Sequence, residues 1–560
     1  MATLTNVRED LGNLTTSLEK FYPHESKLAD KVFLHQPIEG QWYTWTYGQA
    51  GQEIRKMAAY IKENFSEGAK IALLSRNCAH WIMAELAINM AGCTSVPLYP
   101  NIKRETVSYV LEHSDSEALL VGKLIDADWQ EMRQGIPDGF TCIKMGNYSL
   151  DCDYKSWEEI CDSQAPMSES PTRDINDIQT IIYTSGTTGR PKGVVLGADS
   201  LAFGIAQFDK VFNLTDKDRF FSYLPLSHIA ERMLISQGAL VGGSSIHFAE
   251  SLDTFADNLK YAQPTIFLAV PRIWTKFQMG VLAKFPPQRL KLLTSLPILG
   301  GVIKKKIKEA LGLVDARVLL TGAAPMSVSM LEWYEKLGMN IYDVYGMTEN
   351  SALSHANMPN QYKFGTVGKV MTGVEMKLTE QSEICVKSRA NMREYYKMPE
   401  KTAETLKDGW LHTGDKGRVD ADGYLKITGR VKDLFKTSKA KYVAPNPIEQ
   451  KIIGNPNIEQ VCVVGSGIPQ PLALVVLSET ARAADQAEIK SSLEETLKEV
   501  NATLEHHEIL QKMVVVKEEW TVENGILTPT LKIKRGEIDR VFEANYENWY
   551  EGGKGVIYQG

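Results

Sequence analysis

Short apolar runs alternate with segments of helical periodicity along the chain, and this alternation restricts the fold more than any other feature. Residues 70–74 (KIALL) have the pattern of a buried strand, and residues 82–90 then place apolar side chains on one helical face. Similar apolar runs lie at 94–100, 117–122 and 140–145, with a helix expected over 106–112. Strands that alternate with helices pair in parallel, so the sequence predicts an α/β layer fold.

A second series of strand patterns follows residue 177. Its members lie at 178–185, 261–270, 316–322 and 340–346. From about residue 366 the runs become shorter and β-like, and Asp422-Gly423 predicts a hairpin. After Arg430 the pattern changes again, to the α+β order of a small separate domain.

These shifts predict an α/β protein with a large N-terminal domain and a small α+β C-terminal domain. The large domain would cover 1–429, with two α/β sheet subdomains at about 1–170 and 171–365 and a β-rich subdomain at 366–429. The small domain would cover 430–560. With 560 residues the chain is long enough for several such lobes.

The composition excludes several classes of protein. The chain carries 62 Lys and Arg against 69 Asp and Glu, a net charge of −7, which argues against nucleic-acid binding and requires a local positive pocket for any polyanion. It has neither a long apolar run nor a basic start followed by an apolar stretch, so neither a membrane span nor a secretory signal is expected. Seven scattered cysteines without CxxC pairs favour reduced thiols in a cytoplasmic protein and disfavour zinc.

A loop rich in glycine and hydroxyl groups follows the strand end at 181–183. Residues 184–193 (TSGTTGRPKG) combine three glycines, which let backbone N–H groups converge, with four hydroxyls and the charge of Lys192. This composition is typical of a phosphate cradle, and a flexible surface turn is the simpler alternative. Pro191 stands where a Walker loop requires glycine, which argues against a P-loop phosphotransferase.

The string YTSGTTGRPKG (183–193) resembles the signature of the adenylate-forming superfamily, which includes acyl-CoA synthetases, firefly-type luciferases and peptide-synthetase adenylation domains. Seven further strings resemble the remaining motifs of that superfamily, in order and over almost the whole chain. They are VPLYP (96–100), YLPLSHIAER (223–232), TGAAP (321–325), YGMTE (345–349), GWLHTGD (409–415), TGRVKDLFKTSKAKYVAP (428–445) and LTPTLKIKR (527–535).

The resemblance implies which residues bind ATP and Mg²⁺. The phosphates would contact Thr184, Ser185, Gly186, Thr187, Thr188, Gly189 and Lys192, and the α-phosphate Thr348. The adenine would lie between Tyr345 and the backbone of Gly322, Ala323, Ala324 and Pro325, the ribose against Asp415 and Arg430, with Asp343 and Gly346 completing the nucleotide-binding set. Glu349 and the Thr184 hydroxyl would hold Mg²⁺, which prefers hard oxygen ligands.

The resemblance also implies that Lys532, His228 and Thr348 take part in catalysis. A carboxylate attacks the α-phosphorus and pyrophosphate leaves, so the step needs neutralised charge more than acid–base work, which suits Lys532 and Mg²⁺. The resulting mixed anhydride is activated toward the thiol of coenzyme A. Lys432 matches the hinge about which the small domain rotates between the two half-reactions.

Each of these residues has a simpler structural alternative. Asp415 follows a glycine and could cap a turn, and His228 could be a core histidine. Lys532 lies in a basic run that could form only a solvated face. For each residue taken alone, the structural alternative is favoured. Because all three residues match the superfamily motifs in register with the phosphate loop, the functional roles are favoured for the set.

Two features point to a long, apolar acid. Residues 264–277 resemble the segment in which long-chain acyl-CoA synthetases place a tunnel-gating tryptophan, here Trp274, although a core aromatic fits equally. From Lys276 to Lys308 eight basic residues and no acidic one interleave with apolar pairs. Residues 276–308 would therefore either lie on an anionic membrane surface, as a peripheral contact, or form an exposed helical hairpin. The oligomeric state is left open.

Three positions depart from the superfamily pattern. Ala440 stands where glycine is usual in the loop after the hinge, where a methyl group would crowd the backbone or oppose a positive φ. Ser382 replaces the glycine of GEI, and Glu394 replaces the glycine before the tyrosine pair. None of the three is expected to touch ATP, so the departures bear on the thioester half of the reaction.

The sequence thus predicts a long-chain fatty-acid–CoA ligase that converts ATP, a fatty acid and coenzyme A into acyl-CoA, AMP and pyrophosphate. One alternative is an acyl-adenylate-forming enzyme that loads a carrier-protein phosphopantetheine or uses a medium-chain or aromatic acid. A second alternative is a non-catalytic adenylate- or lipid-binding homologue, which the presence of Lys532 and Glu349 disfavours.

Overall fold

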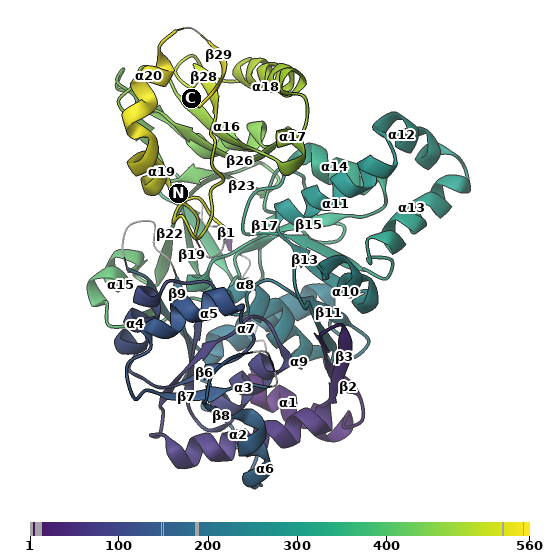
Figure 1. The fold of residues 1–560 in the computed structure, drawn as a ribbon, viewed down its shortest axis with the longest axis vertical. Helices are drawn as coiled ribbons and strands as arrows, with labels where there is room; N and C mark the ends of the chain where they lie inside the picture. The colour runs from purple at the N-terminus through teal and green to yellow at the C-terminus, as the bar shows by residue number, and fades with distance from the viewer. Residues whose placement is uncertain are drawn as a thin grey trace.

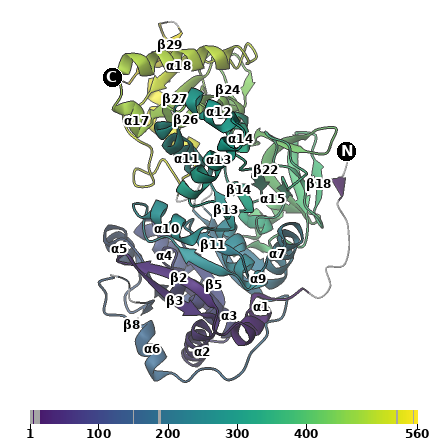
Figure 2. The same ribbon diagram turned by 90° about the vertical axis from the view of Figure 1, so that its right-hand side faces the viewer.

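The computed structural model describes residues 4–5, 14–146, 148, 150–184, 190–528, 531–552 and 554–559. A large body, formed by residues up to 430, carries a smaller C-terminal body, drawn in green to yellow in Figure 1. Figure 2 shows the same arrangement from the side, with the C-terminal body again at one end. None of the helices in the described part of the chain combines the length and hydropathy that a membrane crossing requires.

The first sheet of the large body has eight strands. In spatial order they are β20 (Glu394–Tyr395), β10 (Lys192–Gly197), β9 (Ile178–Thr184), β5 (Thr94–Leu98), β4 (Lys70–Leu74), β6 (Ser116–Val121), β7 (Thr141–Lys144) and β8 (Lys155–Ser156). Successive residues of a strand face opposite sides, so Ala72 and Leu74 pack under α4 (Arg104–His113) and α5 (Asp126–Met132). Ile71 and Leu73 pack on the other side, with α2 (Tyr47–Asn64) and α3 (Ala79–Met90).

The second sheet of the large body has nine strands. Their order is β17 (Lys369–Val370), β16 (His355–Ala356), β15 (Ile341–Tyr345), β14 (Val318–Thr321), β13 (Ile266–Ala269), β11 (Arg219–Ser222), β12 (Ser245–Phe248), β2 (Val32–Ile38) and β3 (Gln41–Thr46). The outer face is covered by α10 (Phe255–Ala262), α11 (Pro271–Lys284) and α14 (Val328–Lys336). The inner face shares one core with the first sheet, through α3 and α7 (Ala198–Phe212). All residues of α3 are buried, as a helix between two sheets requires.

The sequence predicted that the strands of these two sheets divide near residue 170. In the structure they do not divide there. β9, which lies after that position, pairs in parallel with β5, and Ser95 is in register with Thr180. β2, near the N-terminus, pairs in parallel with β12 in the second sheet. The apolar patterns located several strands, β5 and β9 among them, but missed β2 and β12, and they contain no information about which distant strand each one pairs with. The predicted domain and subdomain boundaries themselves stay predictions.

A third, six-stranded sheet completes the large body. It contains β1 (Leu4–Thr5), β18 (Glu375–Leu378), β19 (Glu383–Lys387), β22 (Trp410–Val419), β21 (Leu406–Lys407) and β23 (Leu425–Arg430). β22 and β23 pair antiparallel around Asp422-Gly423, so the predicted hairpin is confirmed. Arg430, the last residue of β23, is where the chain leaves the large body.

The C-terminal body has two sheets and its own cores. Its strands are β24 (Phe435–Lys436), β25 (Tyr442–Val443), β26 (Ile458–Val464), β27 (Leu472–Leu477), β28 (Lys512–Val515) and β29 (Gly555–Tyr558). Its helices include α16 (Pro445–Ile452), α17 (Glu479–Arg482), α18 (Gln486–Asn501), α19 (Arg535–Phe542) and α20 (Tyr546–Tyr550). Two hydrophobic clusters draw all their described members from residues 435–557, which supports the proposal of a separate C-terminal domain.

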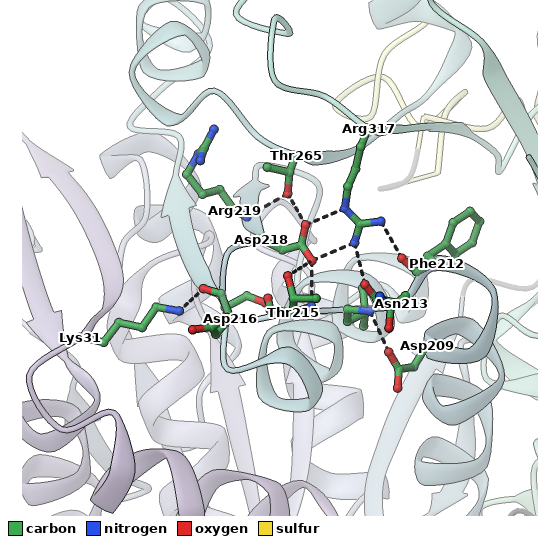
Figure 3. A network of polar contacts seen from close by, with 12 residues as sticks. Lys31, Asp209, Phe212, Asn213, Thr215, Asp216, Asp218, Arg219, Thr265 and Arg317 are labelled. Atoms are coloured by element: carbon green, nitrogen blue, oxygen red, sulfur yellow. Dashed lines mark hydrogen bonds and ion pairs between the residues drawn. The ribbon is translucent and has the colours of Figure 1, made fainter.

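An ion pair between the buried carboxylate of Asp218 and the exposed side chain of Arg317 ties the amino ends of three adjacent strands of the second sheet together (Figure 3). Asp218, Thr265 and Arg317 each directly precede one of the strands β11, β13 and β14. Asp218 accepts hydrogen bonds from Arg317 Nε at 2.9 Å and from Thr265 Oγ1 at 2.6 Å. Burial alone would raise the pKa of Asp218, but these hydrogen bonds and one from the Thr215 backbone outweigh it and lower the pKa.

We expect Asp218→Asn to lower the free energy of unfolding by about 1–3 kcal/mol, since Arg317 loses a charged partner. Because the folded pKa is lowered, the contribution of Asp218 is present above its unfolded pKa of about 4 and is lost as the pH falls through the folded value. Denaturant titration at pH 7 and at acidic pH measures both effects. Asp315→Asn, which breaks an exposed pair with Arg219, is the control and should change stability by under about 1 kcal/mol.

Trp274 has the environment of a core residue. Its side chain is fully buried, and Nε1 donates to Ala269 O at 3.1 Å and to Leu320 O at 3.3 Å. Its ring packs edge-on against Phe267 and Tyr334, with centroid separations of 5.6 and 5.1 Å. These contacts favour the core alternative over movement of the ring, and the gating role stays a prediction.

Trp274→Ala should therefore lower the free energy of unfolding by about 3–5 kcal/mol, because it opens a cavity and leaves two carbonyl groups without a donor. Chemical denaturation measures this loss. Trp333→Ala, at a half-buried position on α14, is the matched control and should cost less. A stable Trp274→Ala protein with an altered chain-length preference would contradict the core assignment and favour the gate.

Candidate active site

The candidate site lies at the carboxyl edge of the second sheet, opposite the Asp218 network. β14 and β15 run in parallel, with Thr321 in register with Asp343, so the loops that follow them leave the sheet side by side. Ligands of α/β sheets commonly bind at this edge. The β22–β23 hairpin and the C-terminal body supply the remaining walls, through Asp415 and Lys532.

The loop after β14, where the sequence predicted the adenine-binding slot, is largely exposed to solvent. Gly322 lies close to β15, and a Cβ there would come within 3.1 Å of Val344 O. Ala323, Ala324 and Pro325 are exposed, and Ala323 has a φ of 65°, which turns the chain outward. Beside this loop, burial raises the pKa of Asp343 to about 8, so its carboxyl group is mostly protonated at neutral pH.

Tyr345, Asp415 and Arg430 form one hydrogen-bonded chain. The Tyr345 hydroxyl donates to Asp415 Oδ2 at 2.7 Å, and Arg430 Nε donates to Asp415 Oδ1 at 2.8 Å. Asp415 and Arg430 are cross-strand partners on β22 and β23. The Asp415 carboxylate thus joins an aromatic ring and a cation at the predicted ribose position, and does more than cap a turn.

A support for Asp415 was missed in the sequence. Glu383 Oε1 accepts from the Gly414 backbone at 3.1 Å, and Glu383 Oε2 lies 2.8 Å from His412 Nδ1. Cys385 Sγ lies 3.4 Å from the same His412 nitrogen. These contacts fix the turn just before Asp415. The register of two antiparallel strands creates them, and a motif scan along one strand does not detect such a register.

Glu349 and Lys192 meet around another residue that was missed, Tyr395. The Tyr395 hydroxyl donates to Glu349 Oε1 at 2.7 Å, and Lys192 Nζ lies 4.0 Å from the Tyr395 ring centroid. Burial lowers the pKa of Lys192, an effect that Glu349 opposes and that Lys432 and Arg430 reinforce. The β9–β10 hairpin pairs Lys192 with Thr184. The predicted phosphate-loop residues Ser185, Gly186, Thr187, Thr188 and Gly189 lie outside the described residues.

The donors near Glu349 fit a hard cation. Tyr395 occupies one oxygen of the Glu349 carboxylate, which leaves the carboxylate a second oxygen to offer. Thr184 ends β9 with a hydroxyl side chain that is partly exposed. Carboxylate and hydroxyl oxygens are the ligands that Mg²⁺ prefers, with water completing its shell. Thr348, which the sequence assigned to the α-phosphate, is buried beside Glu349 in the same short helix (Thr348–Asn350).

His228 is held as a neutral imidazole. It heads α8 (Ile229–Glu231), where its Nδ1 accepts a hydrogen bond from the Ala230 backbone at 3.2 Å. Burial and the nearby charge of Lys532 lower the pKa of His228 to about 4. Because Nδ1 is an acceptor, the ring hydrogen is on Nε2, which can donate to an oxygen atom of a ligand.

Lys532 reaches the site from the C-terminal body. Its side chain is exposed, but its surroundings still cost it hydration, which lowers its pKa. Arg430 lowers the pKa further, whereas Asp415 and Glu349 raise it. These influences show that Lys532 faces the same cluster as the ribose and metal candidates. Lys432 is exposed just after β23, on the segment that connects the two bodies.

Two of the three glycine replacements keep the backbone conformation that glycine favours. Ala440 has a φ of 57° and Ser382 a φ of 62°. A non-glycine residue in this region costs about 1–2 kcal/mol, so the methyl group of Ala440 opposes the positive φ without preventing it. Glu394 instead lies extended in the edge strand β20, paired with Val195.

Comparisons with known proteins agree with this geometry. Residues 23–396 match the model of the AMP-binding enzyme family, and residues 432–554 match that of the AMP-binding enzyme C-terminal domain. The chain is 30% identical to the long-chain-fatty-acid–CoA ligase ACSBG2 of Gallus gallus, over 95% of this chain and 81% of that protein. It is 28% identical to the long-chain-fatty-acid–CoA ligase FadD15 of Mycobacterium bovis, over 94% and 96%.

Solved structures share the fold at lower identity. An anthranilate CoA ligase in complex with anthranoyl-AMP aligns with a TM-score of 0.79 and 21% identity, over 96% of this chain and all of that one. The A-PCP didomain of the carboxylic acid reductase from Segniliparus rugosus, in complex with AMP, aligns with a TM-score of 0.80 and 20% identity, over 96% and 82%. With both family models matched in order and more than half of the residues covered, this chain belongs to the AMP-binding enzyme family.

Proposed function

We propose that this protein is a long-chain fatty-acid–CoA ligase. It uses ATP and Mg²⁺ to form an acyl-adenylate and transfers the acyl group to coenzyme A, with AMP and pyrophosphate as the other products. The observation that carries this proposal is the grouping of charges around Lys532, from the C-terminal body: Arg430, Asp415 and Glu349 all influence its pKa, and Arg430 pairs with Asp415. A lysine in such a group is placed to meet the charge that develops on a phosphoryl group.

Adenylation requires the acid and the α-phosphorus to meet in line. A carboxylate oxygen forms a bond to the α-phosphorus, and the bond to the bridging oxygen of pyrophosphate breaks. Lys532 and Lys192 neutralise charge on the phosphates, while Asp415 and Arg430 orient the ribose. Bound Mg²⁺, held by Glu349 and Thr184, supplies further charge neutralisation. His228 donates from Nε2 to the acid and remains neutral throughout.

Thioester formation is the second step. The thiolate of coenzyme A attacks the acyl carbonyl carbon, and the bond from that carbon to the AMP oxygen breaks. AMP leaves, so the step needs no covalent bond to the protein and no catalytic cysteine. This agrees with the fact that burial raises the pKa of Cys385 to about 11, which disfavours a reactive thiolate.

The choice of a long-chain acid and of free coenzyme A rests on the named relatives. Both curated relatives reported above are long-chain-fatty-acid–CoA ligases. The solved neighbours include a ligase for an aromatic acid and a reductase adenylation domain joined to a carrier domain, which correspond to the alternative acids and acceptors. Their lower identity, 20–21%, supports the fold alone.

Pyrophosphate release with acids of graded chain length, with and without coenzyme A, tests the proposal. We expect release to depend on an acid and to be highest with long chains, AMP to be the nucleotide product, and acyl-CoA to form only when coenzyme A is present. Release of ADP, or release that depends on no acid, would refute the proposed function.

A pair of lysine variants tests the assignment of Lys532 in the same assay. Lys532→Ala should lower pyrophosphate release by at least about 100-fold, because it removes a charge aimed at the reacting phosphate. Lys534→Ala, in the same basic run but at the start of α19, should release pyrophosphate at nearly the original rate. Equal rates for the two variants would remove Lys532 from the mechanism.

We also propose that the protein contacts anionic membranes through the tip of a helical hairpin. α12 (Pro287–Ser295) and α13 (Leu299–Ala310) project from one side of the large body (Figure 1). Ile298 between them is 90% exposed and Leu292 63% exposed. Exposed basic side chains surround these apolar ones: Lys284, Arg289, Lys291, Lys305 and Lys306. Apolar groups flanked by cations suit an anionic lipid surface.

Sedimentation with vesicles measures this contact. The double variant Leu292→Ser/Ile298→Ser should bind vesicles containing anionic lipid at least about tenfold more weakly, since two apolar side chains no longer enter the interface. Leu252→Ser, at an 82% exposed leucine elsewhere, is the control and should bind as before. Binding of the original protein should fall with salt and with neutral lipid. If the original protein does not bind anionic vesicles, residues 276–308 form only an exposed hairpin.

A further inference from the structure

An ion pair joins the two bodies at a point away from the connecting segment. Arg272 is the second residue of α11, just after the carboxyl end of β13 in the large body. Its guanidinium pairs with Oε1 of Glu459, the second residue of β26 in the C-terminal body. The Arg272 side chain is 45% exposed and that of Glu459 is 17% exposed. Glu459 is therefore the more constrained partner, and the Arg272 side chain extends toward it.

Glu459 is fixed within the C-terminal body before Arg272 is considered. Its second oxygen, Oε2, lies 3.8 Å from Arg482 Nη2, at the end of α17. Arg482 in turn pairs with Glu519. Glu459 therefore directs Oε1 toward the large body, while Oε2 faces Arg482 within the C-terminal body.

The same patch anchors the segment that carries Lys532. Gln460, next to Glu459, exchanges two hydrogen bonds with the Trp520 backbone, at 2.9 and 3.1 Å. Trp520 is itself buried, and Leu527 bonds back to Thr521 at 2.9 Å. Leu527 also forms a bridge with Ile533, directly after Lys532. These contacts connect the strand that carries Glu459 with the segment that carries Lys532.

The contact near the connecting segment does not by itself fix the position of the C-terminal body relative to the large body. There, α16 lies beside β23, close to where the chain passes from one body to the other. A body attached near one point can still rotate about it, whereas a second contact at a distance limits that rotation. Arg272 and Glu459 provide such a second contact among the described residues.

We propose that Arg272 is a positioning residue for adenylation, which seats the C-terminal body through Glu459 and so holds Lys532 in the cleft. The inference rests on the proposed function for its effect on rate. Lys532 is needed when charge develops on the phosphates, which occurs in adenylation. Attack of coenzyme A on a preformed acyl-adenylate does not require this charge, so the pair should affect the two half-reactions differently.

The first test separates the half-reactions. Arg272→Gln and Glu459→Gln should each lower pyrophosphate release about twofold to fivefold, the range expected for a partly exposed ion pair. The double variant should be no slower than either single one, because both remove the same contact. Thioester formation from supplied acyl-adenylate and coenzyme A should not fall. Arg272→Lys should recover part of the lost rate, and Arg104→Gln, which removes an exposed charge on α4, should change neither step.

The second test does not depend on the reaction. Lys432 is exposed on the connecting segment, and Lys436, Lys439 and Lys441 are exposed in the first hairpin of the C-terminal body, so trypsin cleavage at these lysines reports how firmly the bodies are seated. Arg272→Gln and Glu459→Gln should speed this cleavage, and Arg104→Gln should not. Unchanged cleavage, equal loss in both half-reactions, or additive effects in the double variant would overturn the proposal. If the original protein releases no pyrophosphate with any acid, the proposed function fails instead, and the cleavage rates still decide whether the pair seats the body.

Discussion

The Asp415 carboxylate is the contact on which the rest of the site depends. One oxygen accepts from Tyr345 at the end of β15, and the other from Arg430 at the end of β23. The second sheet is thereby joined to the third sheet where the candidate nucleotide slot opens. Val431, the next residue, donates its backbone N–H to Gly414 O at 2.8 Å. The carboxylate thus also fixes the point from which the chain leaves for the C-terminal body.

The charges around Asp415 explain how a chain with a net charge of −7 can attract a polyanion. Lys192 and Lys532 both have lowered pKa values, because each is partly stripped of water and each has cations nearby. Arg430 contributes to both shifts. A bound triphosphate would relieve this repulsion and favour the charged form of both lysines. Ligand binding would thus offset the unfavourable electrostatic free energy of holding these cations close together.

The sequence predicted local structure well and long-range pairing poorly. The strands at 70–74 and 94–100 and the hairpin at Asp422-Gly423 are present, because apolar periodicity and turn residues act locally. The pairing of β9 with β5 was missed because β9 does not encode its distant partner, and β2 was not predicted as a strand. In the site, the motif strings contain Asp415 and Glu349, whose roles stay predictions. Their contacts with Glu383 and Tyr395 could not be predicted, because cross-strand register and tertiary contact supply them.

The two ends of the site differ in charge: cations gather at one end, whereas burial disfavours charge on His228 and Glu231 at the other. At one end lie the cations around Asp415. At the other, Asn77 and Glu231 hold the turn that carries His228: Asn77 Oδ1 accepts from Leu226 at 3.0 Å, and Glu231 Oε1 accepts from Tyr223 at 2.9 Å. Burial raises the pKa of Glu231 to about 8, just as it keeps His228 neutral. A surrounding poor in water that disfavours charge on both groups would also disfavour a free carboxylate, and so promote its attack on the phosphate at the charged end.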